Sequence, residues 1–219
     1  MTHVDIPADG VHLPGDVEGI EGARGVVVFA HGSGSSRFSP RNQAVAAGLR
    51  QAGFATLLFD LLTAEEGEVD ARTRHLRFDI ELLAERLGAV TDWLGEHGPT
   101  RALAPAYFGA STGAAAALIA AAARQEHVAA VVSRGGRPDL AGASLPHVRC
   151  PTLLVVGGND REVLALNRDA AARMSAPVTI EVVPGAGHLF EEPGALDRVT
   201  DLAADFLAQH VPPAAASEG

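Results

Sequence analysis

Cysteine and long apolar runs are nearly absent from this sequence. Its 219 residues include one cysteine, Cys150, so no disulfide bond can form within the chain and a secreted disulfide scaffold is excluded. The longest apolar run, residues 113–123, is shorter than the roughly 20 residues that a membrane-spanning helix needs. The N-terminus has neither the basic start nor the apolar stretch of a signal peptide. We therefore expect a cytoplasmic protein that does not enter a membrane.

The chain has fewer basic residues than acidic ones, 17 against 27, and its net charge is −10. Nucleic acids and anionic membrane surfaces bind to basic faces, so neither is the expected partner. The chain has no phosphate-binding glycine loop of the P-loop or dinucleotide type, and its histidines are not spaced as metal ligands. The sequence predicts a small-molecule substrate, no cofactor and no metal. A homodimer is compatible with it.

Apolar runs alternate with helical patterns along the chain, which predicts βα units and a mostly parallel sheet. We expect one α/β domain over residues 1–211, with a twisted sheet covered by helices on both faces, and a flexible tail at 212–219. Residues 178–183 alternate more than the other runs and are expected nearer an edge. The expected strands are 25–31, 55–60, 104–109, 129–133, 152–157 and 178–183, with short ones at 4–7 and 11–14. The expected helices are 40–52, 74–96, 112–125, 161–174 and 195–210.

The expected strand at residues 104–109 runs directly into Gly-Ala-Ser-Thr-Gly, with Ser111 at the centre, and a helix follows at once. This is G-x-S-x-G between a strand and a helix, the setting of a nucleophile elbow. The sharp turn raises the serine hydroxyl above the sheet, and the two glycines let the chain pass close to itself. An accidental Gly/Ser/Ala turn is the alternative in a chain rich in these residues. The context favours Ser111 as a nucleophile.

A serine hydroxyl needs a base, and His188 follows the last expected strand in a glycine-rich loop. Asp160 follows the preceding strand, at the same edge of the sheet. The chain order Ser111, Asp160, His188 is that of a hydrolase triad. A solvated loop histidine and a helix N-cap are the alternatives for the base and the acid. Asp139, which follows another strand, competes with Asp160 for the acid.

The first buried strand ends in His-Gly-Ser-Gly-Ser-Ser at residues 31–36. In this plan the backbone N–H of a residue in that loop and the N–H of the residue after the nucleophile hold the oxyanion. These donors are expected to be Ser33 and Thr112, with Gly34 as an alternative donor and a substrate contact. A flexible Gly/Ser loop without this role is the competing interpretation.

With these residues placed, the chain resembles the α/β-hydrolase superfamily, and within it the small capless members similar to dienelactone hydrolase. The matching pieces are residues 31–36, 109–113, 157–160 and 185–190, and the resemblance covers residues 25–210. Dienelactone hydrolase proper uses a cysteine nucleophile, where this chain has Ser111, so its substrate is not carried over. Cys150 precedes Pro151 at the start of a strand and cannot replace Ser111. Relatives of this kind are sometimes joined to a phosphoribosyltransferase domain, but this chain has no acidic-pair phosphoribosyl-diphosphate loop.

These observations predict a serine hydrolase that cleaves small carboxylic esters, thioesters or lactones through an acyl-enzyme on Ser111. An acyltransferase or a metal-free perhydrolase with the same triad is one alternative, and a non-enzymatic binding module is another. The segment at residues 134–151, where larger relatives insert a lid, is too short for a lid domain, so we expect an open site.

Two arginines in that short segment, Arg134 and Arg137, lie at the expected edge of the site. Arginine suits bidentate recognition of carboxylate or phosphate, so an anionic substrate is one hypothesis. Solvated arginines paired with the abundant acidic residues are the other.

Overall fold

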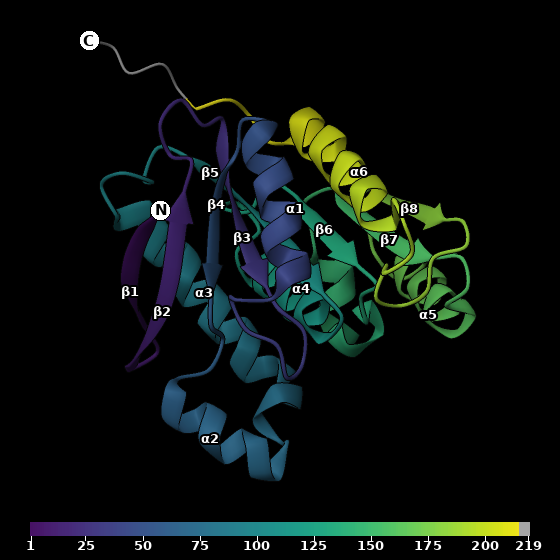
Figure 1. Cartoon of the computed structure of the whole chain (residues 1–219), viewed down its shortest axis with the longest axis horizontal. Helices are drawn as coiled ribbons and strands as arrows, with labels where there is room; N and C mark the ends of the chain where they lie inside the picture. Colours follow the sequence, from purple (N-terminus) through teal and green to yellow (C-terminus); the bar gives the residue numbers. More distant parts are fainter. Residues whose placement is uncertain (215–219) are drawn as a thin grey trace.

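An eight-stranded sheet forms the centre of the protein (Figure 1). The structure is a computed structural model, and it describes residues 1–214. Its strands are β1 (Thr2–Ala8), β2 (Val11–Glu18), β3 (Gly25–Ala30), β4 (Ala55–Phe59), β5 (Ala104–Ala110), β6 (Val131–Arg134), β7 (Thr152–Gly157) and β8 (Val178–Val183). The helices are α1 (Pro40–Gln51), α2 (Ala64–Thr73), α3 (Ile80–Glu96), α4 (Thr112–Ala123), α5 (Arg161–Ala171) and α6 (Ala195–His210). Two 3-10 segments, η1 (Leu76–Phe78) and η2 (Pro138–His147), complete the described elements.

The strand order across the sheet is β1-β2-β4-β3-β5-β6-β7-β8. The hairpin β1–β2 and the pair β2–β4 are antiparallel, and every other neighbouring pair is parallel. The predicted single-domain α/β fold with a mostly parallel sheet is therefore confirmed, and β8 lies at an edge as its alternating pattern indicated. Because the parallel strands share one direction, the loops that follow β3 to β8 meet at one edge of the sheet.

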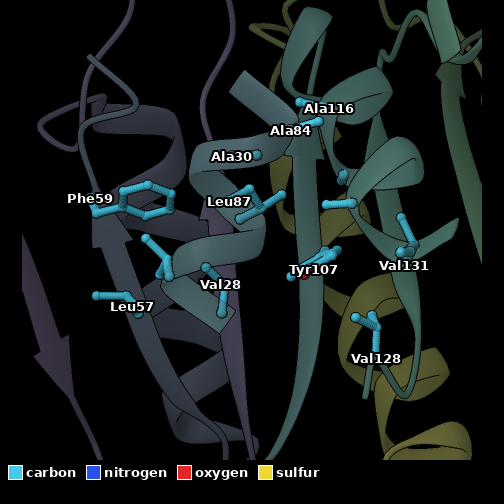
Figure 2. Close-up of a cluster of buried hydrophobic side chains, with 14 of the residues drawn as sticks. Val28, Ala30, Leu57, Phe59, Ala84, Leu87, Tyr107, Ala116, Val128 and Val131 are labelled. Atoms are coloured by element: carbon cyan, nitrogen blue, oxygen red, sulfur yellow. The ribbon is translucent and has the colours of Figure 1, made fainter. Parts of the chain in front are cut away.

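Both faces of the sheet are covered by helices, so the central strands β3, β4, β6 and β7 are buried at every position. Val26 and Val28 of β3 belong to the core beside α3 and α4, whereas Val27 and Phe29 face the core beside α1 and α6. Figure 2 shows the first of these two cores, where Leu87 of α3 packs near side chains of the central strands. The continuous apolar runs of the sequence reflect this burial on two sides.

One expected helix, residues 74–96, begins later than predicted: α3 covers residues 80–96, and residues 74–79 hold the C-cap of α2 and η1. Arg74 adopts a left-handed conformation, with φ of 58°, and ends α2. Asp79 then caps a new helix, because its side chain accepts a hydrogen bond from the N–H of Leu82, and α3 runs from Ile80. The preceding α2 (Ala64–Thr73) was not expected. It carries a capping box in which the Thr63 side chain accepts from the N–H of Glu66.

The segment between β6 and β7 contains only the short η2, so the expected absence of a lid domain is confirmed. Strand β6 begins at Val131, two residues later than expected. No helix in the described part of the chain is both long and apolar enough to cross a membrane. Residues 215–219 of the expected flexible tail lie outside the described residues.

The loop after β3 is clamped at both ends to the residues that follow β4. At its start, the N–H of Leu61 donates to Nε2 of His31 over 3.1 Å. Nδ1 of His31 must then carry the proton, and it lies 3.0 Å from the carbonyl oxygen of Gly32. At the loop's far end, the N–H and guanidinium of Arg37 both donate to the carboxylate of Asp60. Burial lowers the pKa of His31, although the Gly32 carbonyl and Asp60 act in the opposite direction.

This clamp requires neutral His31, which predicts a specific pH dependence of stability. Below about pH 6.5 the unfolded chain takes up a proton at this residue, whereas the folded chain does so only at lower pH. The free energy of unfolding should therefore fall from pH 7 to pH 5, by up to about 1.4 kcal/mol per pH unit from this residue. Urea unfolding of the wild type and of His31→Gln, whose amide does not titrate, checks this. Equal slopes against pH in the two proteins would contradict it.

Candidate active site

The candidate nucleophile lies where β5 ends and α4 begins, at the edge of the sheet where the loops gather. Ser111 has φ of 51° and ψ of −121°, an unusual conformation for a residue other than glycine. Such strain persists only where the surrounding structure imposes it. The buried Ala-rich helix α4 starts at Thr112, so its N-terminal N–H groups and the positive end of its dipole lie beside Ser111.

Three glycines allow this turn to pack backbone against backbone. A Cβ on Gly113 would lie 2.1 Å from the carbonyl oxygen of Ala30 at the end of β3, and one on Gly109 would lie 2.4 Å from the Cα of Ala114. A Cβ on Gly32 would lie 3.2 Å from the Cβ of Ser111. The first two distances are far below van der Waals contact, so these positions admit no side chain. The pattern of glycines around Ser111 thus has a steric cause.

His188 and Asp160 lie together, on the loops that follow β8 and β7. Nδ1 of His188 is 2.7 Å from Oδ2 of Asp160. Since an ionised carboxylate only accepts hydrogen bonds, Nδ1 carries the proton and Nε2 is left free to accept one. Asp160 precedes α5 in the N-cap position, yet its side chain makes no capping hydrogen bond. Its carboxylate is directed to the histidine instead of to the helix.

The competing acid, Asp139, is bound elsewhere. Both of its carboxylate oxygens accept hydrogen bonds from the guanidinium of Arg137, at 2.9 and 2.8 Å. This pairing raises the pKa of Arg137, and the main cause is the hydrogen bond that its guanidinium donates to Asp139. Neither residue has a hydrogen bond to His188 among the described residues. Arg137 is therefore an arginine already paired with an acid, as the second of the two hypotheses for the arginines expects.

Arg134 at the end of β6 and the loop that follows it lie between the candidate nucleophile turn and the histidine loop. The N–H of Ser111 donates to the carbonyl oxygen of Arg134 over 3.3 Å, and the N–H of Arg137 donates to the carbonyl oxygen of Ser111 over 3.0 Å. A Cβ on Gly135 would lie 2.9 Å from the carbonyl oxygen of His188. Within the described residues Ser111 Oγ has no hydrogen bond, an arrangement common in sites that tighten only around a substrate.

The two candidate oxyanion donors, Thr112 and Ser33, belong to segments that adjoin Ser111. Thr112 is its chain neighbour at the first position of α4. Ser33 follows Gly32, which packs against Ser111, and the carbonyl of the Gly32–Ser33 peptide is held by His31 and by the N–H of Ser35. Gly34, the alternative donor, has φ of 70°, and a Cβ there would lie 2.9 Å from Nη1 of Arg77.

Arg134 differs from the other arginines near this edge. Its exposed fraction is 9%, and its buried Nη1 has no hydrogen-bond partner among residues 1–214. Burial, with the positive charge of Arg41 acting in the same direction, lowers the pKa of Arg134 to about 10. Arg41 itself is paired with Glu191, with Nη1 and Oε1 3.1 Å apart. Arg134 is thus a buried cation without an acid partner in the described residues.

A cavity of about 480 Å³ lies beside the loop that carries Ser33. The outer wall of this cavity was not predicted from the sequence, because α2 was not expected. Asp60 and Leu61, which clamp the loop, were also missed as contributors to the site. Their position directly after a buried strand, at the same edge as the candidate nucleophile, was a usable signal. The cavity's described lining comprises Pro14, 31–37, Asp60, Leu62, Thr63, Ala64, Gly67, Asp70, Arg77 and Leu83.

Comparison with known proteins identifies close relatives. A protein of Mycobacterium tuberculosis, named a putative phosphoribosyl transferase, is 57% identical over 208 residues. The match covers 95% of this chain and 46% of that protein, so the chain spans about half the length of this relative.

Solved structures show the same architecture. The crystal structure of a dienelactone hydrolase from Anabaena variabilis is 56% identical, with a TM-score of 0.94 and coverage of 96% of this chain and 97% of that one. Est1E from Butyrivibrio proteoclasticus, at 16% identity, shares the fold with a TM-score of 0.76, over 94% of this chain and 98% of that one. Residues 23–211 match the family described as an alpha/beta hydrolase domain, and the chain belongs to this family.

Proposed function

We propose that this hydrolase is a serine hydrolase that cleaves small carboxylic esters, thioesters or lactones through an acyl-enzyme on Ser111. The observation that carries the proposal is the 2.7 Å contact between His188 Nδ1 and Asp160 Oδ2, on loops of the edge where Ser111 is held in a strained turn. The relative named a dienelactone hydrolase supports ester or lactone chemistry. The name phosphoribosyl transferase supports none here, because the chain spans 46% of that protein and has no phosphoribosyl-diphosphate loop.

In the proposed reaction, Ser111 Oγ attacks the substrate carbonyl carbon while His188 Nε2 takes the hydroxyl proton. Asp160 holds the imidazole in the tautomer with the proton on Nδ1 and stabilises the imidazolium that forms. The N–H groups of Thr112 and Ser33 donate to the negative oxygen of the tetrahedral intermediate. His188 then returns the proton to the leaving alcohol. Water, activated by the same histidine, attacks the acyl-enzyme and releases the acid.

Three substitutions test this proposal. Ser111→Ala should abolish labelling by a fluorophosphonate and reduce kcat on p-nitrophenyl acetate by about 10⁴-fold or more. His188→Ala should lower kcat similarly, and Asp160→Asn should lower it by about 10³- to 10⁴-fold, because the histidine tautomer is no longer fixed. Steady-state kinetics and mass spectrometry of the labelled protein provide the measurements. Asp139→Asn serves as the matched control and should leave kcat near the wild-type value.

The alternatives give different outcomes in the same assays. Labelling of Ser111 with no ester turnover, and release of the acyl group only to an added alcohol, thiol or peroxide, would assign an acyltransferase or a perhydrolase. If the wild-type protein is neither labelled nor active on any ester, a non-enzymatic binding module is the remaining interpretation. Retained turnover in Ser111→Ala would contradict the proposed nucleophile.

The proposal includes an anion site at Arg134, whose guanidinium lacks an acid partner in the described part of the chain. A buried charge is costly unless paired, so a substrate anion would complete this environment. Strand β6 lies on the same side of β5 as β7 and β8, which precede the acid and the base. We therefore place the anion on the alcohol portion of the substrate. Arg137 is a weaker candidate, because Asp139 already binds its guanidinium.

A pair of substrates tests the anion site: 4-acetoxybenzoate and its uncharged methyl ester. A charge-assisted hydrogen bond contributes about 1.5–3 kcal/mol, so Arg134→Gln should lower the carboxylate-to-methyl-ester ratio of kcat/KM by about 10- to 100-fold. Arg137→Gln should keep the wild-type ratio. Thermal melting checks the fold, and Arg134→Gln should melt no lower than the wild type, since it removes an unpaired buried charge. An unchanged ratio in Arg134→Gln would overturn the anion site.

A further inference from the structure

The cavity beside the Ser33 loop is a feature that the proposed chemistry does not yet use. Its volume is about 480 Å³, within the usual range for small-molecule sites. One wall is the loop of residues 31–37, whose Gly32 packs against the Cβ of Ser111. The opposite wall comes from the segment after β4 and from α2, which protrudes beyond the sheet at the bottom of Figure 1. The cavity therefore adjoins the candidate oxyanion loop on the side away from β6.

We infer that this cavity binds the acyl portion of the substrate, and that it takes an uncharged acyl group larger than acetyl. This inference rests on the proposed serine-hydrolase function.

The order of the strands separates the acyl and alcohol sides of the site. Asp160 and His188 follow β7 and β8, on one side of β5, whereas the cavity lies at the ends of β3 and β4, on the other side. The leaving alcohol must receive its proton from His188, so it must face the histidine. The oxyanion faces Thr112 and Ser33. The remaining substituent of the tetrahedral carbon, the acyl chain, is then directed toward β3 and β4.

The charges in the cavity wall are already balanced within the protein. Asp60 accepts hydrogen bonds from Arg37. Asp70 accepts them from the N–H and Nε of Arg77, at 3.1 and 2.5 Å. His31 is neutral in its clamp. Each acidic side chain of the lining thus has an arginine partner from the same lining, so the wall offers no uncompensated charge.

The rest of the lining is apolar or small. Pro14, Leu62 and Leu83 contribute apolar surface from β2, from the segment after β4 and from α3. Burial against such surface stabilises the binding of an uncharged acyl chain. An acyl chain that carried a negative charge would instead lie beside the carboxylates of Asp60 and Asp70. The chemical class that fits is an ester of an uncharged acid with several carbons.

One face of α2 sets the depth of the cavity. Ala64, Gly67 and Asp70 recur at three-residue spacing and all line it, so they share one face of the helix. A Cβ on Gly67 would meet no atom within 4 Å, and its φ is not in the left-handed region. A larger side chain at Gly67 can therefore enter this space without a clash. Gly95 in α3 is a matched position, because a Cβ there also meets nothing and it does not line the cavity.

The test is the acyl-length profile of Gly67→Leu against Gly95→Leu. In the wild type, kcat/KM should rise by about fourfold per added methylene from p-nitrophenyl acetate to the hexanoate, as the cavity fills. Gly67→Leu should lower the hexanoate-to-acetate ratio by at least about tenfold, and Ala64→Leu should lower it in the same direction. Gly95→Leu should keep the wild-type ratio. Both substitutions replace a helical glycine by leucine, which raises helix propensity, so thermal melting of the two variants checks that neither has lost stability.

A second substrate pair varies the alcohol at constant acyl group: p-nitrophenyl acetate and 1-naphthyl acetate. Their kcat/KM ratio should be the same in Gly67→Leu and the wild type. A ratio that changes here while the acyl profile stays flat would assign the cavity to the alcohol and overturn the inference. An unchanged acyl profile in both Gly67→Leu and Ala64→Leu would overturn it as well. Failure of the proposed function is distinct, since the wild type would then hydrolyse none of these esters.

Discussion

The close packing of three backbone segments around Ser111 is the constraint on which the rest of the site depends. The end of β3, the turn after β5 and the first turn of α4 approach so closely that Gly113 has no room for a Cβ beneath the carbonyl of Ala30. Ser111 is held at φ of 51° by this contact and by the hydrogen bonds of its N–H to Arg134 at the end of β6 and of its C=O to Arg137 in the following loop. Because the strain is imposed by packed backbone, it does not require flexible side chains to maintain it.

The packing around Ser111 also determines where the charged and dipolar groups of the site lie. The turn directs the N-terminus of α4 toward the candidate oxyanion, and the same sheet edge brings the loop of Asp160 to that of His188. Around this centre the ionisable groups fall into two kinds. Asp60, Asp70 and Asp139 are each matched by an arginine, which keeps their charges compensated. Arg134 is buried without such a partner in the described residues, and that contrast distinguishes it among the arginines at the edge.

Sequence patterns predicted the strands better than the segment after β4. The central strands are buried on both faces, and continuous apolar runs record that burial directly. The helix expected at residues 74–96 was predicted to begin six residues too early, because its amphipathic pattern continues through Arg74, which ends α2 in a left-handed conformation, and through the Asp79 cap. Neither feature breaks the periodicity of apolar residues. The capping box of Thr63 and Glu66 was present in the sequence, however, and marks the start of α2.

The sequence by itself determined the fold class, the sharp turn at the candidate nucleophile Ser111 and the chain order of Ser111, Asp160 and His188, because strand burial and glycine spacing are local properties. Two decisions belonged to the tertiary structure. Asp160 and Asp139 both follow strands at the same edge of the sheet. Only the folded chain shows that Asp139 binds Arg137, whereas Asp160 contacts His188. The cavity likewise exists only where the loop after β3 faces α2. Both features depend on contacts between residues far apart in the chain. No local sequence pattern shows which residue a charged side chain will pair with, or which segments will face each other across a cavity.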